Sequence, residues 1–367
     1  MRTCSRLGAT PAGGLGCCGW ARLGVGFGVV SVVSMGMLAL AGAAPVPAQP
    51  PPERGIALGL FSADPHFSYR PLIDEIAATG ASHVSVAWVW WQDDVAATLI
   101  RPVAGASATD DQVLDAMQYA RRRGLTVTAF PIVRLLRRGP EEWRGRIRPA
   151  CEDDWWATYQ AFILRAAELA AHAKAERLAI GSELLSRESM RERWVETIDR
   201  VRLQAPDLSL LYSANWDHYD KVSFWDHVDI VGLTAYWEVG GANLDASEAA
   251  LAWAWRGPKA QIVAFGRRLG RGIVLTEVGY PSLDGGACWP WDETRQAPVD
   301  LEEQRRAYAA FVRVWSGTPE LQGVYFWNWF GFGGKLDGGY TPRNKPAQAV
   351  IERWFENGRP MRERIRP

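Results

Sequence analysis

The chain has 367 residues, of which 48% are hydrophobic and 22% are charged. This composition is typical of a globular protein with a large buried core and excludes an intrinsically disordered chain. Lysine plus arginine and aspartate plus glutamate each total 41 residues, so no excess charge indicates nucleic acid or an anionic membrane as partner. We therefore expect no nucleic acid partner and a partner that is small or neutral.

Residues 1–44 have the features of an export signal. They contain Arg2, Arg6 and Arg22 but no lysine and no acidic residue, and they end in an apolar run from Val25 to Ala44. A basic start, an apolar run and a small-residue exit predict a signal peptide, although the run is also long enough for an uncleaved membrane anchor. Both alternatives place the rest of the chain outside the cytoplasm, as a secreted, periplasmic or membrane-anchored protein.

Residues 45–54 are proline-rich and are expected to form a linker, residues 55–358 a single domain, and residues 359–367 a C-terminal tail. In the domain, short β-branched or aromatic runs alternate with longer amphipathic stretches, which predicts repeated strand-helix units on a parallel sheet. The predicted strands are 56–61, 83–92, 125–135, 177–185, 209–216, 229–237, 272–280 and 321–330. The clearest predicted helices are 110–123, 153–174, 190–204, 247–269 and 301–315.

Eight such units predict an α/β fold of the (β/α)8 TIM barrel type. An open, doubly wound sheet is the alternative, but the Ser-Ala-Asp-Pro-His segment after Phe61 lacks the glycine-rich turn usual in that fold. The connection at residues 281–298 is long and is expected to overhang the barrel mouth. Cys151 and Cys288 could form one disulfide in an exported protein, with two free thiols as the default.

Two glutamates stand at strand ends, where the chemistry of this fold takes place. Glu183 ends the fourth predicted strand and Glu277 ends the seventh. Each follows an apolar run, so each carboxylate would be costly to bury without a partner or a function. A structural glutamate paired with a barrel arginine is the alternative for either residue alone. Two carboxylates facing one mouth are what glycosidic hydrolysis requires.

Three motifs resemble those of glycoside hydrolase clan A, and most closely those of glycoside hydrolase family 113: Gly-Ser-Glu183, Thr-Glu277-Val-Gly-Tyr and Tyr-Phe-Trp327-Asn-Trp. The segment Trp143-Arg-Gly-Arg-Ile-Arg-Pro supports the resemblance. It implies a retaining double displacement with Glu183 as general acid/base and Glu277 as nucleophile, and it implies no cofactor and no metal. The implied substrate is a β-linked hexose polysaccharide or oligosaccharide, with endo-β-1,4-mannanase-like cleavage. We expect the protein to be a monomer.

Aromatic and polar residues at other strand ends are candidates for sugar binding, since indole faces stack on pyranose rings. By resemblance, Trp327 lies under the sugar next to the cleaved bond, and Tyr236 donates a hydrogen bond to the nucleophile. Ser182 stands where many clan members have asparagine, so its contact with the sugar 2-hydroxyl is open. Core packing or loop capping is the alternative for each candidate. The full set of substrate-binding candidates is Trp91, Gln92, Ser182, Asn215, Trp216, Tyr236, Trp327 and Asn328.

Two other functions remain in competition. A non-catalytic sugar-binding barrel would keep the tryptophans while losing a carboxylate, and this chain keeps both. A metal-dependent hydrolase would use His and carboxylate ligands from several strand ends, but the first strand has no His-x-His motif. The acidic and histidine residues that could support a metal site are Asp217, His218, Asp220, Asp226, His227 and Asp229, which we expect to form a surface loop.

Overall fold

The computed structural model describes residues 52–357. The predicted export signal, most of the predicted linker and the predicted C-terminal tail lie outside these residues. Within the described range, no helix is both long and apolar enough to cross a membrane. Cys151 is exposed, Cys288 is buried, and neither forms a disulfide there, as the default expectation had it.

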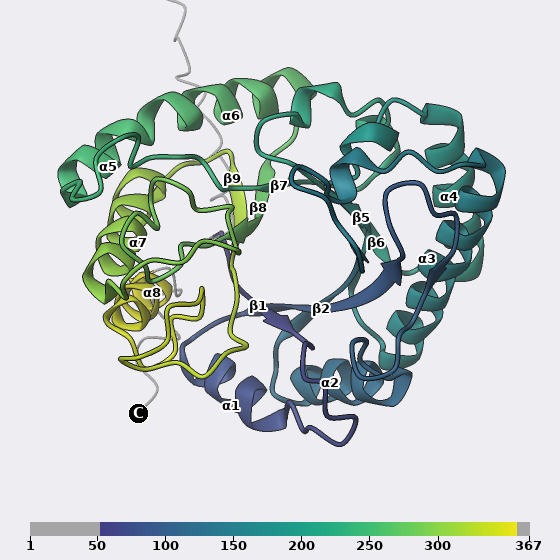
Figure 1. Ribbon diagram of the computed structural model, residues 1–367, viewed down its shortest axis with the longest axis horizontal. Coiled ribbons are helices and arrows are strands. Elements are labelled where there is room, and N and C mark those ends of the chain that lie inside the picture. The colour runs from purple at the N-terminus through teal and green to yellow at the C-terminus, as the bar shows by residue number, and fades with distance from the viewer. Residues whose placement is uncertain (1–51, 358–367) are drawn as a thin grey trace, which may run out of the picture. The chain divides into compact units, whose positions relative to one another are not determined.

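Eight parallel strands close into a barrel, because β1 pairs with both β2 and β9 at the two ends of the strand order. Figure 1 shows the strands around a central axis with helices outside them. A short strand, β3 (Ile100–Arg101), pairs antiparallel with the end of β2. The barrel strands are β1 (Glu53–Gly59), β2 (His83–Gln92), β4 (Thr126–Leu135), β5 (Arg177–Ser182), β6 (Ser209–Ala214), β7 (Ile230–Thr234), β8 (Ile273–Val278) and β9 (Leu321–Phe326).

The helices form the outer layer that the amphipathic stretches predict. Their ends carry local signals: Thr109 and Gln112 form a reciprocal capping box at the start of α2, and Gly270 ends α6 in a left-handed conformation. The described helices are α1 (Arg70–Ala78), α2 (Asp110–Arg122), α3 (Glu152–Ala173), α4 (Arg191–Gln204), α5 (Glu248–Ala254), α6 (Arg256–Leu269), α7 (Leu301–Trp315) and α8 (Pro346–Asn357).

The prediction of a (β/α)8 barrel is confirmed, with two differences in its elements. The helix expected at 247–269 is two helices that meet at Trp255, where Pro258 in the first turn of α6 has no amide hydrogen to continue the α5 ladder. Six of the eight strands also end two to four residues earlier than predicted. The residues beyond those strand ends lie in the loops that build the site described below.

Two layers of apolar side chains hold the barrel together. Inside it, Ala87, Val89, Phe130, Ile132, Ala179 and Leu211 form a small buried cluster. Between strands and helices lies a larger cluster, in which Trp155, Trp156, Trp194, Trp255 and Trp315 are almost fully buried. Many of the tryptophans are therefore packing residues, and the carboxyl ends of the strands are held rigidly from both sides.

Candidate active site

A cavity of about 810 Å³ opens at the carboxyl ends of the barrel strands. Every barrel strand contributes to it, either from its last residues or from the loop that follows. One lining residue from each strand, in barrel order, is Phe61, Val89, Ile132, Glu183, Asn215, Tyr236, Glu277 and Trp327. The predicted pair of glutamates therefore shares one cavity.

Glu277 lies in β8 with only 3% of its surface exposed. The hydroxyl of Tyr236 donates to Oε2 of Glu277 at 2.8 Å, and Oε1 has no hydrogen-bond partner among the described residues. Burial raises the pKa of Glu277, and the nearby charge of Glu183 raises it further, while Arg144 and the Tyr236 hydrogen bond oppose the rise. The two glutamates thus lie close enough for their charges to interact.

Glu183 directly follows β5 and is 7% exposed. Arg144, in a 3-10 turn at Arg144–Arg146, donates from Nη2 to Oε2 of Glu183 at 2.6 Å. Burial alone would lower the pKa of Arg144, but the charges of Glu183, Glu277 and Glu293 outweigh burial and raise this pKa. Arg144 therefore stays cationic and compensates the paired carboxylates. The alternative of a glutamate paired with an arginine thus holds for Glu183, but both partners line the cavity.

Four of the eight predicted substrate-binding residues line the cavity: Asn215, Trp216, Tyr236 and Trp327. They follow β6, β7 and β9, so aromatic side chains lie between the two glutamates and on the far side of Glu277. Only Tyr236 has a contact that specifies a role, because it binds Glu277. Sugar contacts by Asn215, Trp216 and Trp327 stay predictions.

Gln92 is a correction to the sequence prediction, because it is fully buried and lies outside the cavity lining. Its Oε1 accepts from Nε1 of Trp155 at 2.8 Å, and its Nε2 donates to the carbonyl of Asp94 at 2.7 Å. Along β2, Trp90 stacks on Phe162 of α3, and Gln92 points the same way by strand alternation. Gln92 therefore ties β2 to α3 and has no free amide group for a sugar.

The remaining three predicted residues also lie outside the lining. Trp91 donates from Nε1 to the carbonyl of Ala106 at 3.2 Å. Ser182 is 3% exposed, and its hydroxyl has no hydrogen-bond partner within residues 52–357. Asn328 accepts the amide of Phe330 at 2.8 Å through Oδ1. None of the three is placed against the cavity in the way the sequence analysis expected.

An ion bridge spans the mouth of the cavity, and sequence reasoning missed it. Glu293, from the connection after β8, pairs with Arg134 at the end of β4 and, at 3.2 Å, with Arg138 in the following loop. In a closed barrel of eight strands, β4 and β8 stand opposite each other. The bridge therefore joins opposite rims, and the connection at 281–298 contributes Trp291, Asp292, Glu293 and Thr294 to the lining.

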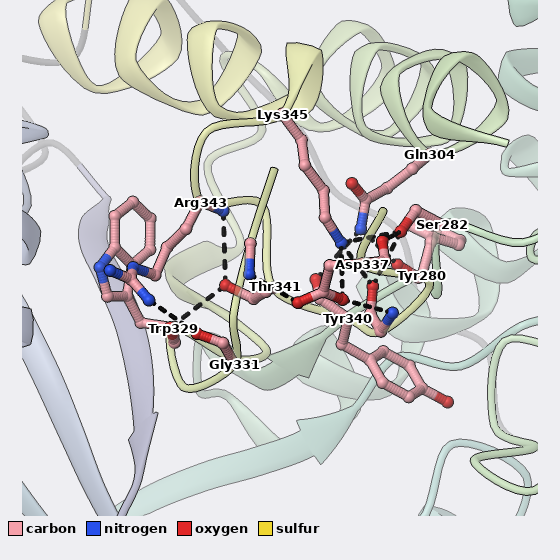
Figure 2. A network of polar contacts seen from close by, with 12 residues as sticks. Tyr280, Ser282, Gln304, Trp329, Gly331, Asp337, Tyr340, Thr341, Arg343 and Lys345 are labelled. Carbon is pink, nitrogen blue, oxygen red and sulfur yellow. Dashed lines mark hydrogen bonds and ion pairs between the residues drawn. The ribbon is translucent and has the colours of Figure 1, made fainter. Parts of the chain in front are cut away.

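A buried lysine fixes the loops after β8 and β9 to each other, as Figure 2 shows. Lys345 pairs with Asp337 at 3.2 Å and donates to Oγ of Ser282 at 2.7 Å and to the carbonyl of Gly339 at 3.0 Å. Tyr340, which follows Gly339 in the chain, lines the cavity and donates to the carbonyl of Pro290 at 2.6 Å. Lys345 thus anchors one wall of the site from behind.

The acidic and histidine residues that could have supported a metal site do not gather in one place: Asp217 lines the cavity and pairs with its neighbour His218, while two others pair with arginines. Asp226 pairs with Arg191 at 2.6 Å and Asp229 pairs with Arg202 at 2.9 Å. In the described part of the chain, no group of three or more His, Cys, Asp or Glu residues is arranged to hold a metal ion. Among the carboxylates that line the cavity, Glu183 and Glu277 are the two that lie buried, with Arg144 as the cation beside them.

Comparison with known proteins adds to this geometry. The family model of Glycoside Hydrolase Family 113 matches residues 68–332. A GH113 β-mannanase, AaManA from Alicyclobacillus acidocaldarius, solved in complex with ManMIm, is 25% identical with a TM-score of 0.74, covering 84% of this chain and 98% of that chain. A GH113 β-1,4-mannanase solved as a complex is 21% identical with a TM-score of 0.73, covering 83% and 98%. No curated protein matches in sequence. The family match spans most of the barrel and both glutamates, so the chain belongs to glycoside hydrolase family 113 and is a glycoside hydrolase.

Proposed function

We propose that this enzyme is a retaining β-1,4-mannan hydrolase with Glu277 as nucleophile and Glu183 as general acid/base. The observation that carries the proposal is that both carboxyl groups line one cavity, from β8 and from the end of β5, with interacting charges. Retaining enzymes place their two carboxyl groups on the two sides of the scissile bond. The β-mannanases of the same family share the fold over more than four fifths of this chain.

In the first step, Oε1 of Glu277 attacks the anomeric carbon and forms an ester bond. This oxygen has no hydrogen-bond partner among residues 52–357, whereas Oε2 is held by Tyr236. The bond from the anomeric carbon to the leaving oxygen breaks, and this oxygen takes the proton of Glu183. The part of the polysaccharide beyond the cleaved bond leaves with a free hydroxyl group, and the remaining sugar is linked covalently to Glu277.

In the second step, Glu183 takes a proton from water while the water oxygen attacks the anomeric carbon. The ester bond breaks, Glu277 leaves as a carboxylate, and Glu183 is protonated again. Tyr236 and Arg144 favour the ionised form of Glu277 that both steps require, the first by its hydrogen bond and the second by its charge. No cofactor is needed, since the sum of the steps adds one water molecule.

The substrate we propose is β-1,4-mannan or a manno-oligosaccharide, which the enzyme cleaves at internal linkages. We also propose that the enzyme is a monomer. Trp216, between the strands of the two glutamates, and Trp327, on the far side of Glu277, suit stacking against sugar rings. We also propose that the enzyme is exported, because residues 1–44 have the composition of an export signal. N-terminal sequencing of the protein recovered from outside the cytoplasm distinguishes a cleaved signal from an anchor.

The test compares Glu277→Gln and Glu183→Ala on mannan and on an aryl β-mannobioside with a good leaving group. Glu277→Gln should abolish turnover of both substrates, because no ester can form. Glu183→Ala should lose far more activity on mannan, because only the sugar leaving group needs a proton. Glu141→Gln is a matched control, since Glu141 lines the same cavity with its side chain 81% exposed.

Each other outcome has a defined meaning. Equal losses on both substrates in Glu183→Ala would contradict the acid/base assignment. A wild-type protein that binds manno-oligosaccharides without releasing products would be the non-catalytic sugar-binding barrel. Turnover of another β-linked hexose polymer, with none on mannan, would change the substrate and leave the mechanism in place.

A further inference from the structure

The turn that carries Glu183 is held in an unusual backbone conformation. Glu183 has a φ of 53°, in the left-handed region that a residue with a Cβ adopts at a cost. Such a conformation persists only where the surroundings determine it. Here β6 determines it through two adjacent amides: the amide of Glu183 donates to the carbonyl of Ser213 at 2.8 Å, and that of Leu184 donates to the hydroxyl of Tyr212 at 3.0 Å.

The Tyr212 hydroxyl is itself oriented by a second buried glutamate. Tyr212 donates its single hydroxyl hydrogen to Oε1 of Glu188 at 2.7 Å, so the same oxygen is left to accept from Leu184. The Tyr212 ring is fully buried and packs edge-on against Trp194 and Phe224, with centroids 5.2 and 5.0 Å away. The hydroxyl therefore has one position, and that position depends on Glu188.

Glu188 is 1% exposed, and its Oε2 has no hydrogen-bond partner in the described part of the chain. Burial raises the pKa of Glu188 to about 7, the charge of Glu183 adds to the rise, and the hydrogen bond from Tyr212 opposes it. Both the neutral and the charged carboxyl accept the Tyr212 hydrogen through Oε1. Neither Tyr212 nor Glu188 lines the cavity.

We propose that Tyr212 and Glu188 are positioning residues for the general acid: through the amide of Leu184 they hold the left-handed turn that directs the Glu183 carboxyl into the cavity. The inference rests on the proposed function, because it assigns a task only if Glu183 protonates the leaving group. Glu183 must reach the leaving oxygen within hydrogen-bond distance, and a displacement of about 1 Å can cost about 100-fold in rate. The pair thus acts on the proton transfer through the backbone, without touching the sugar.

The experiment measures kcat/KM, which reports the first chemical step, on mannotetraose and on dinitrophenyl β-mannobioside. The first substrate needs a proton on its leaving oxygen and the second does not. Tyr212→Phe keeps the buried ring and removes the hydroxyl. It should lower kcat/KM for mannotetraose by about 10- to 100-fold, and change the value for the dinitrophenyl substrate by less than about threefold.

Tyr159→Phe is the matched control. Tyr159 is also fully buried and packs on Trp194, and its hydroxyl donates at 2.6 Å to the carbonyl of Ile180, which lies before the Glu183 turn. Removal of this hydroxyl should affect both substrates by the same factor, because it perturbs packing without releasing the turn. The ratio of the two kcat/KM values, rather than either value alone, is therefore the readout.

Glu188 variants keep the inference testable if Tyr212→Phe fails to fold. Glu188→Gln retains an oxygen that accepts the Tyr212 hydrogen and should keep the wild-type ratio, whereas Glu188→Leu removes this acceptor and should shift the ratio as Tyr212→Phe does. Equal losses on both substrates in Tyr212→Phe or Glu188→Leu would overturn the positioning role. Glu183→Ala is measured alongside: if it shows no leaving-group dependence, the acid/base assignment and the proposed function fail with it.

Discussion

Replacement of Glu277 by glutamine should stabilise the protein as well as inactivate it, and the gain should grow with pH. Glu277 is buried beside Glu183, and both burial and the Glu183 charge raise its pKa. Above the ordinary titration range of a glutamate, both side chains are ionised in the unfolded chain, while in the folded protein the coupled pair of Glu277 and Glu183 retains one proton between them. The wild-type protein therefore loses stability as the pH rises toward the folded-state pKa, and the glutamine variant lacks this loss.

The magnitude follows from proton linkage. One proton retained by the folded state alone changes the free energy of unfolding by about 1.4 kcal/mol per pH unit. Between pH 5 and pH 7 the stability difference between Glu277→Gln and wild type should therefore increase by about 3 kcal/mol. The other buried acids with raised pKa values, Glu188 and Glu303, titrate in both proteins and cancel from the comparison.

The assay is urea unfolding of both proteins at several pH values, followed by tryptophan fluorescence. The quantity of interest is the pH dependence of the stability difference, since a constant offset would reflect packing or hydrogen bonding of the new amide. Glu141→Gln, with its exposed side chain, should give a difference that is flat with pH. A flat difference for Glu277→Gln as well would refute the reasoning, because it would mean that the buried pair of Glu277 and Glu183 releases its shared proton as easily as the unfolded chain does.

Three further predictions concern the surroundings of the two glutamates. Tyr236→Phe removes the hydrogen bond that favours the ionised Glu277, so the acidic limb of the pH profile of kcat/KM should move to higher pH; an unmoved limb would contradict this role. Lys345→Met leaves the buried Asp337 without its cation and should lower the free energy of unfolding, measured in urea, by about 3–5 kcal/mol. Asp337→Asn added to this variant should recover part of the loss. An unchanged free energy of unfolding in Lys345→Met would contradict the anchoring role of Lys345. Dialysis against EDTA should leave turnover of mannan unchanged, since the proposed mechanism uses two carboxylates and no metal ion; a loss of turnover that an added cation restores would contradict that mechanism.

The barrel and the glutamate pair could be predicted from the sequence because both depend on local patterns. Strand and helix periodicities separate cleanly here, and the bounds of β2 and α7 agree with those predicted. Glu183 and Glu277 stand out because a carboxylate at the end of an apolar strand is rare without a function. The family motifs surround the same two residues, so the two lines of reasoning converge.

The failures lie where a contact joins distant segments or where alternation along a strand was not applied. The role of Arg144 cannot be predicted from its motif, because its contact with Glu183 joins two different loops and no local pattern marks it. Gln92 follows from alternation once one residue of β2 is placed: Val89 faces the cavity, so Gln92, an odd number of residues further along β2, points to the helices. For Trp327, strand alternation gives no direction, because β9 ends one residue earlier, at Phe326; only the structure shows that Trp327 lines the cavity.

The two kinds of ion pair around the cavity differ in their response to dissolved salt. Glu293, Arg134 and Arg138 are between 34% and 42% exposed, whereas Lys345 and Asp337 are 0% and 9% exposed. Mobile ions screen charges at the surface over about 8 Å at physiological ionic strength and have little access to a buried pair. A saline medium should therefore loosen the rim of the cavity at Glu293, Arg134 and Arg138, while the wall that Lys345 anchors keeps its shape. Under the export and the polymeric substrate that we propose, the salt content of the surroundings would then tune how easily the polymer enters without altering how fast a bound linkage is cut.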